Sequence, residues 1–383
     1  MNQSIWLLLT IFMSTTFSAL NARAELLPFY IGASTNDAAQ GIALAQFDTK
    51  TGEINNIETV AVSANPTFLA LHPNGRFLYA ANESGAVAGE KVGGLSAFAV
   101  DAKTKKLTAL NAVAQDGVLC FLSVDATGKF LLTASYTSGE FEIWALLENG
   151  EIGERVELIA PAPETVNDKP KTSNAHQFVL SPDNRFAFAV DLGLDKVFIY
   201  RFDEKTGHLA PADPPFARLA ESAGPRHLAF GKDAKFAYVI NEHGNTVTAF
   251  KRDGGALENL QTLPTLPENY EGKSYTSEIE THPNGKFLYG SNRGRDSIAI
   301  FGIDEKSGQL KSLGEAPTGA WPRHFTIAPG GDWLLAANQN DSSITVFRLD
   351  AATGLLSKSA LIENLPGQPA CLLFPGGSTA APE

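Results

Sequence analysis

Hydrophobic and polar positions along this chain follow a pattern that recurs at intervals of roughly fifty residues. Each copy has a polar turn, an apolar strand that opens with an aromatic residue, a polar corner and a strand of alternating character. Residues 282–304, HPNGKFLYGSNRGRDSIAIFGID, show the pattern clearly. Turn signals between short apolar runs are typical of antiparallel strands. The opening aromatic residue recurs as Phe77, Phe130, Phe186, Phe236, Phe287 and Trp333.

Each repeat predicts four strands, because an apolar strand precedes the polar turn and a short strand follows a later Thr-Gly type turn. Seven such repeats predict an all-β fold, a seven-bladed β-propeller with four antiparallel strands per blade. The first copy, at Phe29, lacks its innermost strand, and the apolar segment Pro369–Pro375 near the other end of the chain supplies one. We therefore expect N- and C-terminal strands to share one blade and to close the ring.

The connections between strands differ in length, and this difference gives the two faces of the disc separate characters. The first-to-second and third-to-fourth turns are short and uniform, and they lie on one face. The remaining connections vary, as in segments 83–93, 161–173, 211–224 and 263–276. Variable loops on a rigid scaffold are where sites are usually built, so we expect the site on the variable face. Segment 263–276 is a candidate lid.

Residues 1–24 resemble a secretory signal peptide. An apolar run, Ile5–Phe17, is followed by Ala22-Arg23-Ala24, a small-x-small cleavage pattern, although no Lys or Arg precedes the run. We therefore expect an exported protein, periplasmic or secreted, whose mature part (residues 25–383) is a single propeller domain without a membrane anchor. A closed propeller with charged outer strands is also expected to be a monomer.

Charge and cysteine content narrow the classes of partner. The formal net charge is −12 and no block of Lys and Arg is present, which argues against nucleic acid and against an anionic membrane surface. The two cysteines, Cys120 and Cys371, lie in apolar runs and are predicted to be buried free thiols. No Cys/His spacing resembles a zinc site, so we expect neither a metal nor another cofactor.

The repeats bring polar residues together at the variable mouth of the central channel. Arginine presents a fixed fork of donors to a carboxylate, a phosphate or a forming oxyanion, and a nearby histidine or glutamate can take a proton. Several arginines at one mouth of an acidic protein indicate a small anionic substrate. The candidates at first-strand starts are His176, Arg226, Glu278 and Arg323, and those at second-strand ends are Asp191, Glu242, Arg293 and Asn338.

Scaffold roles are open for several of these residues. Asn and Asp at strand ends commonly cap turns by bonding nearby backbone, as Asp191 and Asn338 would do. Arg226 and Arg323 recur at one repeat position, so they would equally serve as braces paired with Glu242 and Glu278. The histidines that follow these arginines, His227 and His324, should point to the other side of their strands, because side chains alternate along a strand.

These motifs, in their order and spacing, resemble the lactonase family of seven-bladed propellers, which includes propeller-type 6-phosphogluconolactonase and the carboxy-cis,cis-muconate lactonizing enzyme. The resemblance covers essentially the whole mature chain. The motifs that carry it include Asn174-Ala175-His176-Gln177, Gly224-Pro225-Arg226-His227, Asn241-Glu242 and Phe287–Gly294.

The resemblance also implies a set of site residues. The muconate enzyme's proposed site uses a histidine, two arginines and a glutamate, which implies catalytic roles for His176, Arg226, Glu242 and Arg293, with Arg295 and Arg323 as competitors of Arg293. We expect substrate-binding roles for Glu278, Arg323, Asn338 and Asp191. The family often has a His-Ala-His run, and Asn174 stands in place of its first histidine.

The expected function is an exported lactonase that opens a small sugar-type or anionic lactone by arginine-assisted acid/base catalysis without a metal. Because export separates the protein from phosphorylated cytoplasmic metabolites, an unphosphorylated lactone is the more plausible substrate. Two alternatives stay open. One is a carboxymuconate-type cycloisomerase, and the other is a non-enzymatic periplasmic binding or scaffold propeller.

Overall fold

The computed structural model of the chain describes residues 25–35, 41–83, 93–115 and 117–375. The predicted signal peptide, residues 1–24, and most of the variable segment 83–93 lie outside the described residues. In the part that is described, no helix is long and apolar enough to cross a membrane.

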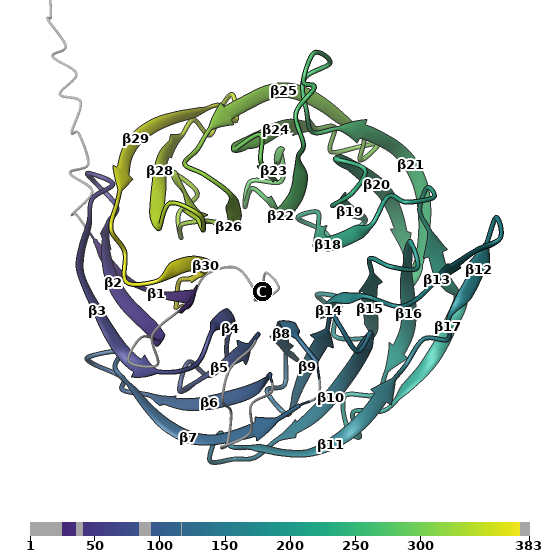
Figure 1. Ribbon diagram of the computed structural model, residues 1–383, viewed down its shortest axis with the longest axis horizontal. Helices are drawn as coiled ribbons and strands as arrows, with labels where there is room; N and C mark the ends of the chain where they lie inside the picture. The colour runs from purple at the N-terminus through teal and green to yellow at the C-terminus, as the bar shows by residue number, and fades with distance from the viewer. Residues whose placement is uncertain (1–24, 36–40, 84–92, 116, 376–383) are drawn as a thin grey trace, which may run out of the picture.

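Seven four-stranded antiparallel sheets are arranged in a ring, as expected for seven blades (Figure 1). The strands nearest the centre are β4 (Pro66–Leu71), β8 (Leu119–Val124), β14 (Ala175–Leu180), β18 (Pro225–Phe230), β22 (Tyr275–Thr281), β26 (Pro322–Ile327) and β30 (Gln368–Leu373). The second strands are β1 (Leu26–Ser34), β5 (Phe77–Asn82), β9 (Phe130–Ser135), β15 (Phe186–Asp191), β19 (Phe236–Asn241), β23 (Phe287–Arg293) and β27 (Trp333–Asn338).

The outer half of each blade is built from the remaining two strands. The third strands are β2 (Gly41–Asp48), β6 (Gly94–Val100), β10 (Glu140–Leu146), β16 (Lys196–Phe202), β20 (Thr246–Asp253), β24 (Ser297–Ile303) and β28 (Ser343–Leu349). The outermost strands are β3 (Ile54–Val62), β7 (Leu107–Ala114), β11 (Ile152–Ile159), β17 (Leu209–Arg218), β21 (Ala256–Pro264), β25 (Leu310–Pro317) and β29 (Leu356–Ile362).

The ring closes within one blade that contains both ends of the propeller. β30 pairs antiparallel with β1, where Ile31 lies opposite Leu372, and the sheet order is β3-β2-β1-β30. Figure 1 shows yellow β30 beside purple β1. The predicted ring closure is confirmed. The closing blade is also joined to its neighbour, because the indole nitrogen of Trp333 on β27 donates a 2.8 Å hydrogen bond to the carbonyl oxygen of Thr49.

The hydrophobic core lies between neighbouring blades, and one contact recurs around the ring. The aromatic residue that opens a second strand packs on the glycine of the next blade's Thr-Gly type turn. A Cβ added to Gly354 would lie 2.3 Å from the ring of Phe287, and one on Gly52 would lie 2.4 Å from that of Trp333. Both glycines also have positive φ, 74° and 78°. The recurring aromatic and the recurring glycine are therefore two halves of one interblade contact, which only glycine accommodates.

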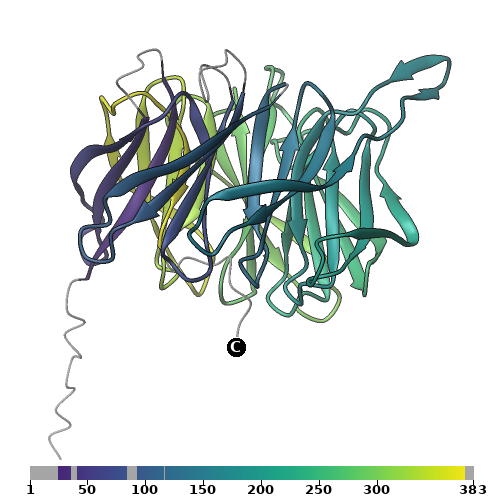
Figure 2. The same ribbon diagram turned by 90° about the horizontal axis from the view of Figure 1, so that it is seen from below.

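Two variable segments have regular structure. Segment 161–173 contains the hairpin β12 (Glu164–Val166) and β13 (Lys169–Lys171), which projects from the upper face of the disc in Figure 2. The prediction of a loop over residues 211–224 is largely wrong, because β17 extends to Arg218. Its prolines are tolerated because β17 is the outermost strand of its blade, where one edge needs no hydrogen-bond donors.

Every inner strand has a register shift near its start. In β18, Pro225 lies opposite Asn241 but His227 lies opposite Ile240, so Arg226 is an extra residue, and the other inner strands show comparable shifts. Such a β-bulge bends the strand and re-aims the side chains beside it. The residues inside these shifts are Thr67, Cys120, His176, Arg226, Ser277 with Glu278, Arg323 and Ala370.

Candidate active site

The polar and charged side chains at the channel mouth come from two positions of the repeat. One is the bulge of the inner strand, which supplies His176, Arg226 and Arg323. The other directly follows the strand-end polar residue of the second strand. In successive blades this second position is occupied by Glu83, Tyr136, Leu192, Glu242, Arg293 and Gln339.

The strand-end residues themselves are tied into their own blades. The amide nitrogen of Asn338 donates hydrogen bonds of 2.9 Å to the hydroxyls of Ser343 and Thr345. The carboxylate of Asp191 accepts a 2.6 Å bond from the Ser173 hydroxyl and bonds from the backbone N–H groups of Asn174 and Leu194. Both Asn338 and Asp191 are fully buried. These bonds hold the blade corner, and substrate contact by either residue stays a prediction.

Arg226 and Arg293 meet at Glu242. The Glu242 Oε2 atom lies 3.2 Å from Arg226 Nε and 2.8 Å from Arg293 Nη2. Each guanidinium also donates to a backbone carbonyl, Arg226 to Ser277 at 2.9 Å and Arg293 to Thr276 at 3.0 Å. The two arginines are 3% and 6% exposed. Two neighbouring blades thus assemble one cluster of two guanidinium groups and one carboxylate.

The charges of this cluster depend on one another. Burial would raise the pKa of Glu242, but attraction from Arg293 and Arg226 outweighs it and lowers that pKa. Burial also lowers the pKa of Arg293, to about 10, although Glu242 opposes this effect. All three groups are therefore ionised at neutral pH, and the carboxylate of Glu242 is a weak base.

His176 lies beside this cluster as a neutral imidazole. Its ring centroid is 5.2 Å from that of His227 and 5.8 Å from that of Tyr136. Burial, followed by repulsion from Arg226, lowers the pKa of His176 well below the usual value of 6.5. Its Nδ1 atom is buried and has no hydrogen-bond partner among the described residues. An unprotonated ring with an uncommitted nitrogen is suited to accept a proton.

The expectation that His227 and His324 lie across their strands from the preceding arginines is wrong for His227, whose Nε2 atom lies 3.4 Å from Arg226 Nη1. His227 Nδ1 lies 2.9 Å from Glu278 Oε1, and His324 Nε2 lies 3.4 Å from Glu278 Oε2. The bulges at Arg226 and Arg323 interrupt strict alternation, and the two histidines that follow them meet at Glu278. Local sequence alternation could not reveal this, although the repeated Pro-Arg-His motif marks both positions.

Glu278 lies between these two histidines and contacts both. Burial opposes ionisation of its carboxyl, but His227 and His324 lower the pKa of Glu278 to about 2. Burial in turn lowers the pKa of His324 to about 4. We therefore assign an ionised carboxylate between two neutral imidazoles at pH 7. His227 then donates from Nδ1 to Glu278, and its Nε2 accepts from Arg226 Nη1 at 3.4 Å.

The remaining arginines have other partners. Arg323 Nη2 donates to both carboxylate oxygens of Glu83, at 3.1 and 3.2 Å, and not to Glu278 as the brace alternative expected. That alternative held for Arg226, which does pair with Glu242. Arg295, a competitor of Arg293, pairs instead with Glu315 and is the more exposed of the two arginines. Arg293 is therefore the arginine of this corner that belongs to the central cluster.

Segment 263–276, the candidate lid, contacts the corner that carries Arg293. The Tyr270 hydroxyl donates to the carbonyl oxygens of Lys273 and Gly294, at 3.3 and 3.1 Å. A Cβ on Gly294 would lie 2.4 Å from the Lys273 carbonyl oxygen, so glycine permits this close approach. Closure of this segment over a ligand stays a prediction.

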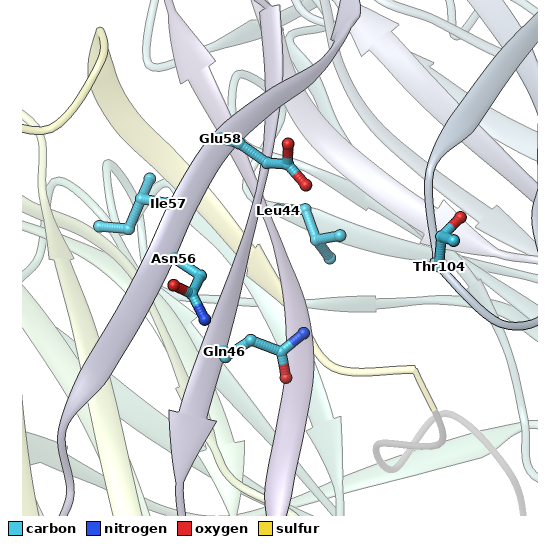
Figure 3. Close-up of a pocket in the computed structure, with 6 residues that line it drawn as sticks. All are labelled: Leu44, Gln46, Asn56, Ile57, Glu58 and Thr104. Carbon is cyan, nitrogen blue, oxygen red and sulfur yellow. The ribbon is translucent and has the colours of Figure 1, made fainter.

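A depression elsewhere on the molecule has different chemistry. It is lined by β2 and β3 of the ring-closing blade and by Thr104 of the next blade. Its only ionisable lining residue, Glu58, forms an exposed ion pair with Lys106 at 3.1 Å. Nothing in its lining resembles the central cluster. Figure 3 shows the lining residues, Leu44, Gln46, Asn56, Ile57, Glu58 and Thr104. Within the described ranges, no group of three or more His, Cys, Asp or Glu residues is arranged to hold a metal ion.

Comparison with known proteins shows which family and which characterised sequences this chain resembles. The family model described as "Lactonase, 7-bladed beta-propeller" matches residues 28–374. A 6-phosphogluconolactonase of Bacillus subtilis is 32% identical over 304 residues, which cover 78% of this chain and 84% of the relative. A 6-phosphogluconolactonase of Formosa agariphila is 33% identical over 308 residues, covering 78% of this chain and 86% of the relative.

Among solved structures, the periplasmic gluconolactonase of Pseudomonas aeruginosa superposes with a TM-score of 0.84. It is 30% identical, and the match covers 94% of this chain and all (100%) of that one. The likeness therefore includes the complete ring of blades.

Proposed function

The chain belongs to the lactonase family of seven-bladed β-propellers, and from this premise we propose that it is a lactone hydrolase with its active site at the cluster of His176, Arg226, Glu242 and Arg293. The observation that carries the proposal is a neutral imidazole with an uncommitted nitrogen beside two buried guanidinium groups. Such a pair supplies a base for water and donors for an oxyanion, the two requirements of ester hydrolysis.

In the proposed mechanism, an arginine N–H group holds the lactone carbonyl oxygen while His176 takes a proton from water. The hydroxide attacks the carbonyl carbon, and the guanidinium groups stabilise the negative oxygen of the tetrahedral intermediate. When the intermediate collapses, the ring C–O bond breaks and the imidazolium returns its proton to the leaving alkoxide. The product is the open hydroxy acid. Glu242 orients both arginines, and Glu278 orients His227 behind them.

We propose an unphosphorylated sugar-type lactone as the substrate. The guanidinium groups of Arg226, Arg293 and Arg323 are matched by the carboxylates of Glu242, Glu83 and Glu278, so the mouth has little net positive charge for a phosphate dianion. The similar Pseudomonas protein is named a gluconolactonase, whereas the Bacillus relative is named a 6-phosphogluconolactonase. The balanced charges favour the first of these substrate types.

Export, a monomeric state and independence from metal belong to the same proposal. The apolar run followed by Ala22-Arg23-Ala24 supports export. Fractionation of the native host should place the mature protein outside the cytoplasm, and recovery of uncleaved protein in the cytoplasm would contradict export. Light scattering tests the monomer, and undiminished activity after EDTA treatment is the expected sign of metal-free catalysis.

The deciding experiment is a pH-stat assay with D-glucono-1,5-lactone and its 6-phosphate. Purified protein should open the unphosphorylated lactone faster than buffer does and faster than it opens the phosphate. Combined Arg226→Ala and His176→Ala substitutions should abolish the enzymatic rate, whereas Arg295→Ala should leave it unchanged. Full activity of the double variant would remove the proposed site, and a preference for the phosphate would overturn the substrate assignment.

A further inference from the structure

Trp321 adopts a backbone conformation that its side chain disfavours. Its φ is +63°, and it directly precedes Pro322 at the start of β26. A bulky residue with positive φ is a rare outlier, and a following proline restricts its backbone further. The Trp321 N–H group donates a 2.8 Å hydrogen bond to Asp296 Oδ1, which helps to hold this conformation.

Two other blades have the same conformation at the same place. Asn65 and Gly224 precede Pro66 and Pro225 with φ of 45° and 63°. In all three blades the carbonyl oxygen of this residue accepts a hydrogen bond from the residue after the strand-end Asn: Glu83 at 3.0 Å, Glu242 at 2.6 Å and Gln339 at 2.9 Å. Asn and Gly tolerate positive φ, whereas Trp does not. The backbone geometry therefore gives no reason for an indole here.

The indole lies at the active-site cluster. The Arg293 guanidinium carbon lies 5.4 Å from the centroid of the Trp321 ring, and the Tyr275 ring lies 6.3 Å from it. Tyr275 occupies the equivalent position in its own blade and is 37% exposed. Trp321 is itself only partly buried. The Trp321 ring thus borders the guanidinium of Arg293, and the Tyr275 ring packs against Trp321. Backbone strain kept at a functional site indicates a functional use of the side chain.

We propose that Trp321, with Tyr275 beside it, is a specificity-determining wall against which the C–H face of a six-membered sugar lactone packs while Arg293 holds its carbonyl oxygen. The inference rests on the proposed lactonase function and adds the part of the substrate that is recognised. The electron-rich face of an indole attracts the weakly positive C–H groups of a sugar ring, as it attracts other positive edges. Equatorial hydroxyls leave such a face free of oxygen, as in gluconolactone.

Two variants test the wall. Trp321→Asn introduces a residue that the same backbone already carries at Asn65, so the fold should persist, and Trp321→Phe retains an aromatic face. In Trp321→Asn, KM for D-glucono-1,5-lactone should rise about tenfold, the loss of one aromatic contact, with kcat within about threefold. Trp321→Phe should keep KM within about threefold of the wild-type value. Calorimetric titration with D-glucono-1,5-lactam, which is not hydrolysed as the lactone is, should show the same order of affinities.

The outcomes separate this inference from the proposed function. Equal lactam affinity in wild type and Trp321→Asn, or no lactam binding by wild type, overturns the wall. A lower kcat at unchanged KM also overturns it, because that result makes Trp321 a positioning residue for Arg293. Lactam binding that weakens in Trp321→Asn, in a protein that opens no lactone, supports the wall and refutes the proposed hydrolysis.

Discussion

At the scale of single residues, Glu242 has the most demanding position, because one of its oxygens, Oε2, pairs with two buried guanidinium groups. Glu242→Gln removes that charge and leaves Arg226 and Arg293 to repel each other. We expect kcat/KM for the lactone to fall by about 100-fold or more, since the arginines would no longer be held for the oxyanion.

Glu83→Gln is the matched control for this substitution, because its partner Arg323 is more exposed. Its loss of kcat/KM should be smaller, and chemical denaturation should show a smaller loss of unfolding free energy than for Glu242→Gln. Wild-type kcat/KM in Glu242→Gln would contradict the assigned role.

His176 sets the expected pH dependence of activity. Because burial and Arg226 lower its pKa well below 6.5, the imidazole stays unprotonated and able to act as a base at mildly acidic pH. The acidic limb of the profile of kcat/KM against pH should therefore lie below pH 6.5. Initial rates from about pH 4.5 to 7.5, with buffer hydrolysis subtracted, measure it. A limb centred at or above pH 6.5 would show that a different group is the base.

Glu280 should make the folded protein less stable as the pH becomes alkaline. Burial raises its pKa to about 8 from the usual 4.5, and its carboxyl accepts a 2.9 Å bond from the Ile327 N–H group. The folded protein keeps a proton that the unfolded chain releases above pH 4.5, so this contribution is complete below pH 4.5 and is lost as pH rises through 8.

The variant Glu280→Gln removes this titration. Its unfolding free energy in urea should exceed that of wild type at about pH 8.5 and come closer to it at about pH 5. The same difference at both pH values would count against a protonated Glu280.

At the scale of elements, the interblade contact between an aromatic residue and a glycine predicts how much unfolding free energy two glycine substitutions should remove. Gly354→Ala drives a Cβ into the Phe287 ring at 2.3 Å, and Gly75→Ala, at a comparable φ of 69°, meets nothing within 4 Å. Gly75→Ala should cost about 1 kcal/mol from backbone strain alone. Gly354→Ala should cost about 2–4 kcal/mol, since the ring must also move. Urea denaturation measures both. Equal losses would show that the contact contributes nothing beyond φ.

The bulged inner strand is the element that makes the site. It re-aims the side chains at Arg226 and Arg323 and brings the histidines that follow them into the central cluster, while the rest of the strand keeps its pairing. The second strand supplies the complementary groups one residue after its strand-end anchor. In six of the blades, a polar scaffold position at the strand end and a site position are therefore neighbours. A substitution at the site position need not disturb the scaffold position.

At the scale of the whole molecule, the seam between β1 and β30 decides whether the ring is closed. Leu372 on β30 is 2% exposed, whereas Leu361 on β29 is 38% exposed. Leu372→Ala should lower the unfolding free energy by about 2–4 kcal/mol, and Leu361→Ala should change it by less than about 1 kcal/mol. Calorimetry measures both. Because closure links the first blade to the last, Leu372→Ala should shift a single transition. An early, separate transition would indicate a blade that opens on its own.

The sequence by itself determined the architecture and the chemistry available to it. A repeat of roughly fifty residues, with alternating strands and turn residues, specifies blades through short-range forces, and seven copies leave a ring as the way to bury both sides of each sheet. The incomplete first copy and the spare strand near Pro369 predicted the closing blade. Residue types at strand starts and ends placed His176, Arg226, Glu242 and Arg293 among the candidates, and the family resemblance selected these four. The fold joins three of them by ion pairs.

Only the tertiary structure decided which side chains meet. A bulge adds one residue to a strand and leaves no clear mark in the sequence. Strict alternation of side chains therefore could not predict that His227 and His324 meet at one carboxylate. Arg323 pairs with Glu83, a residue 240 positions away in the sequence, because ring closure brings distant blades together at the mouth of the central channel. The conformation that makes Trp321 exceptional depends on dihedral angles, which the letters Trp-Pro do not reveal. Repetition is local and can be read from the sequence, whereas convergence on the axis depends on the closed ring.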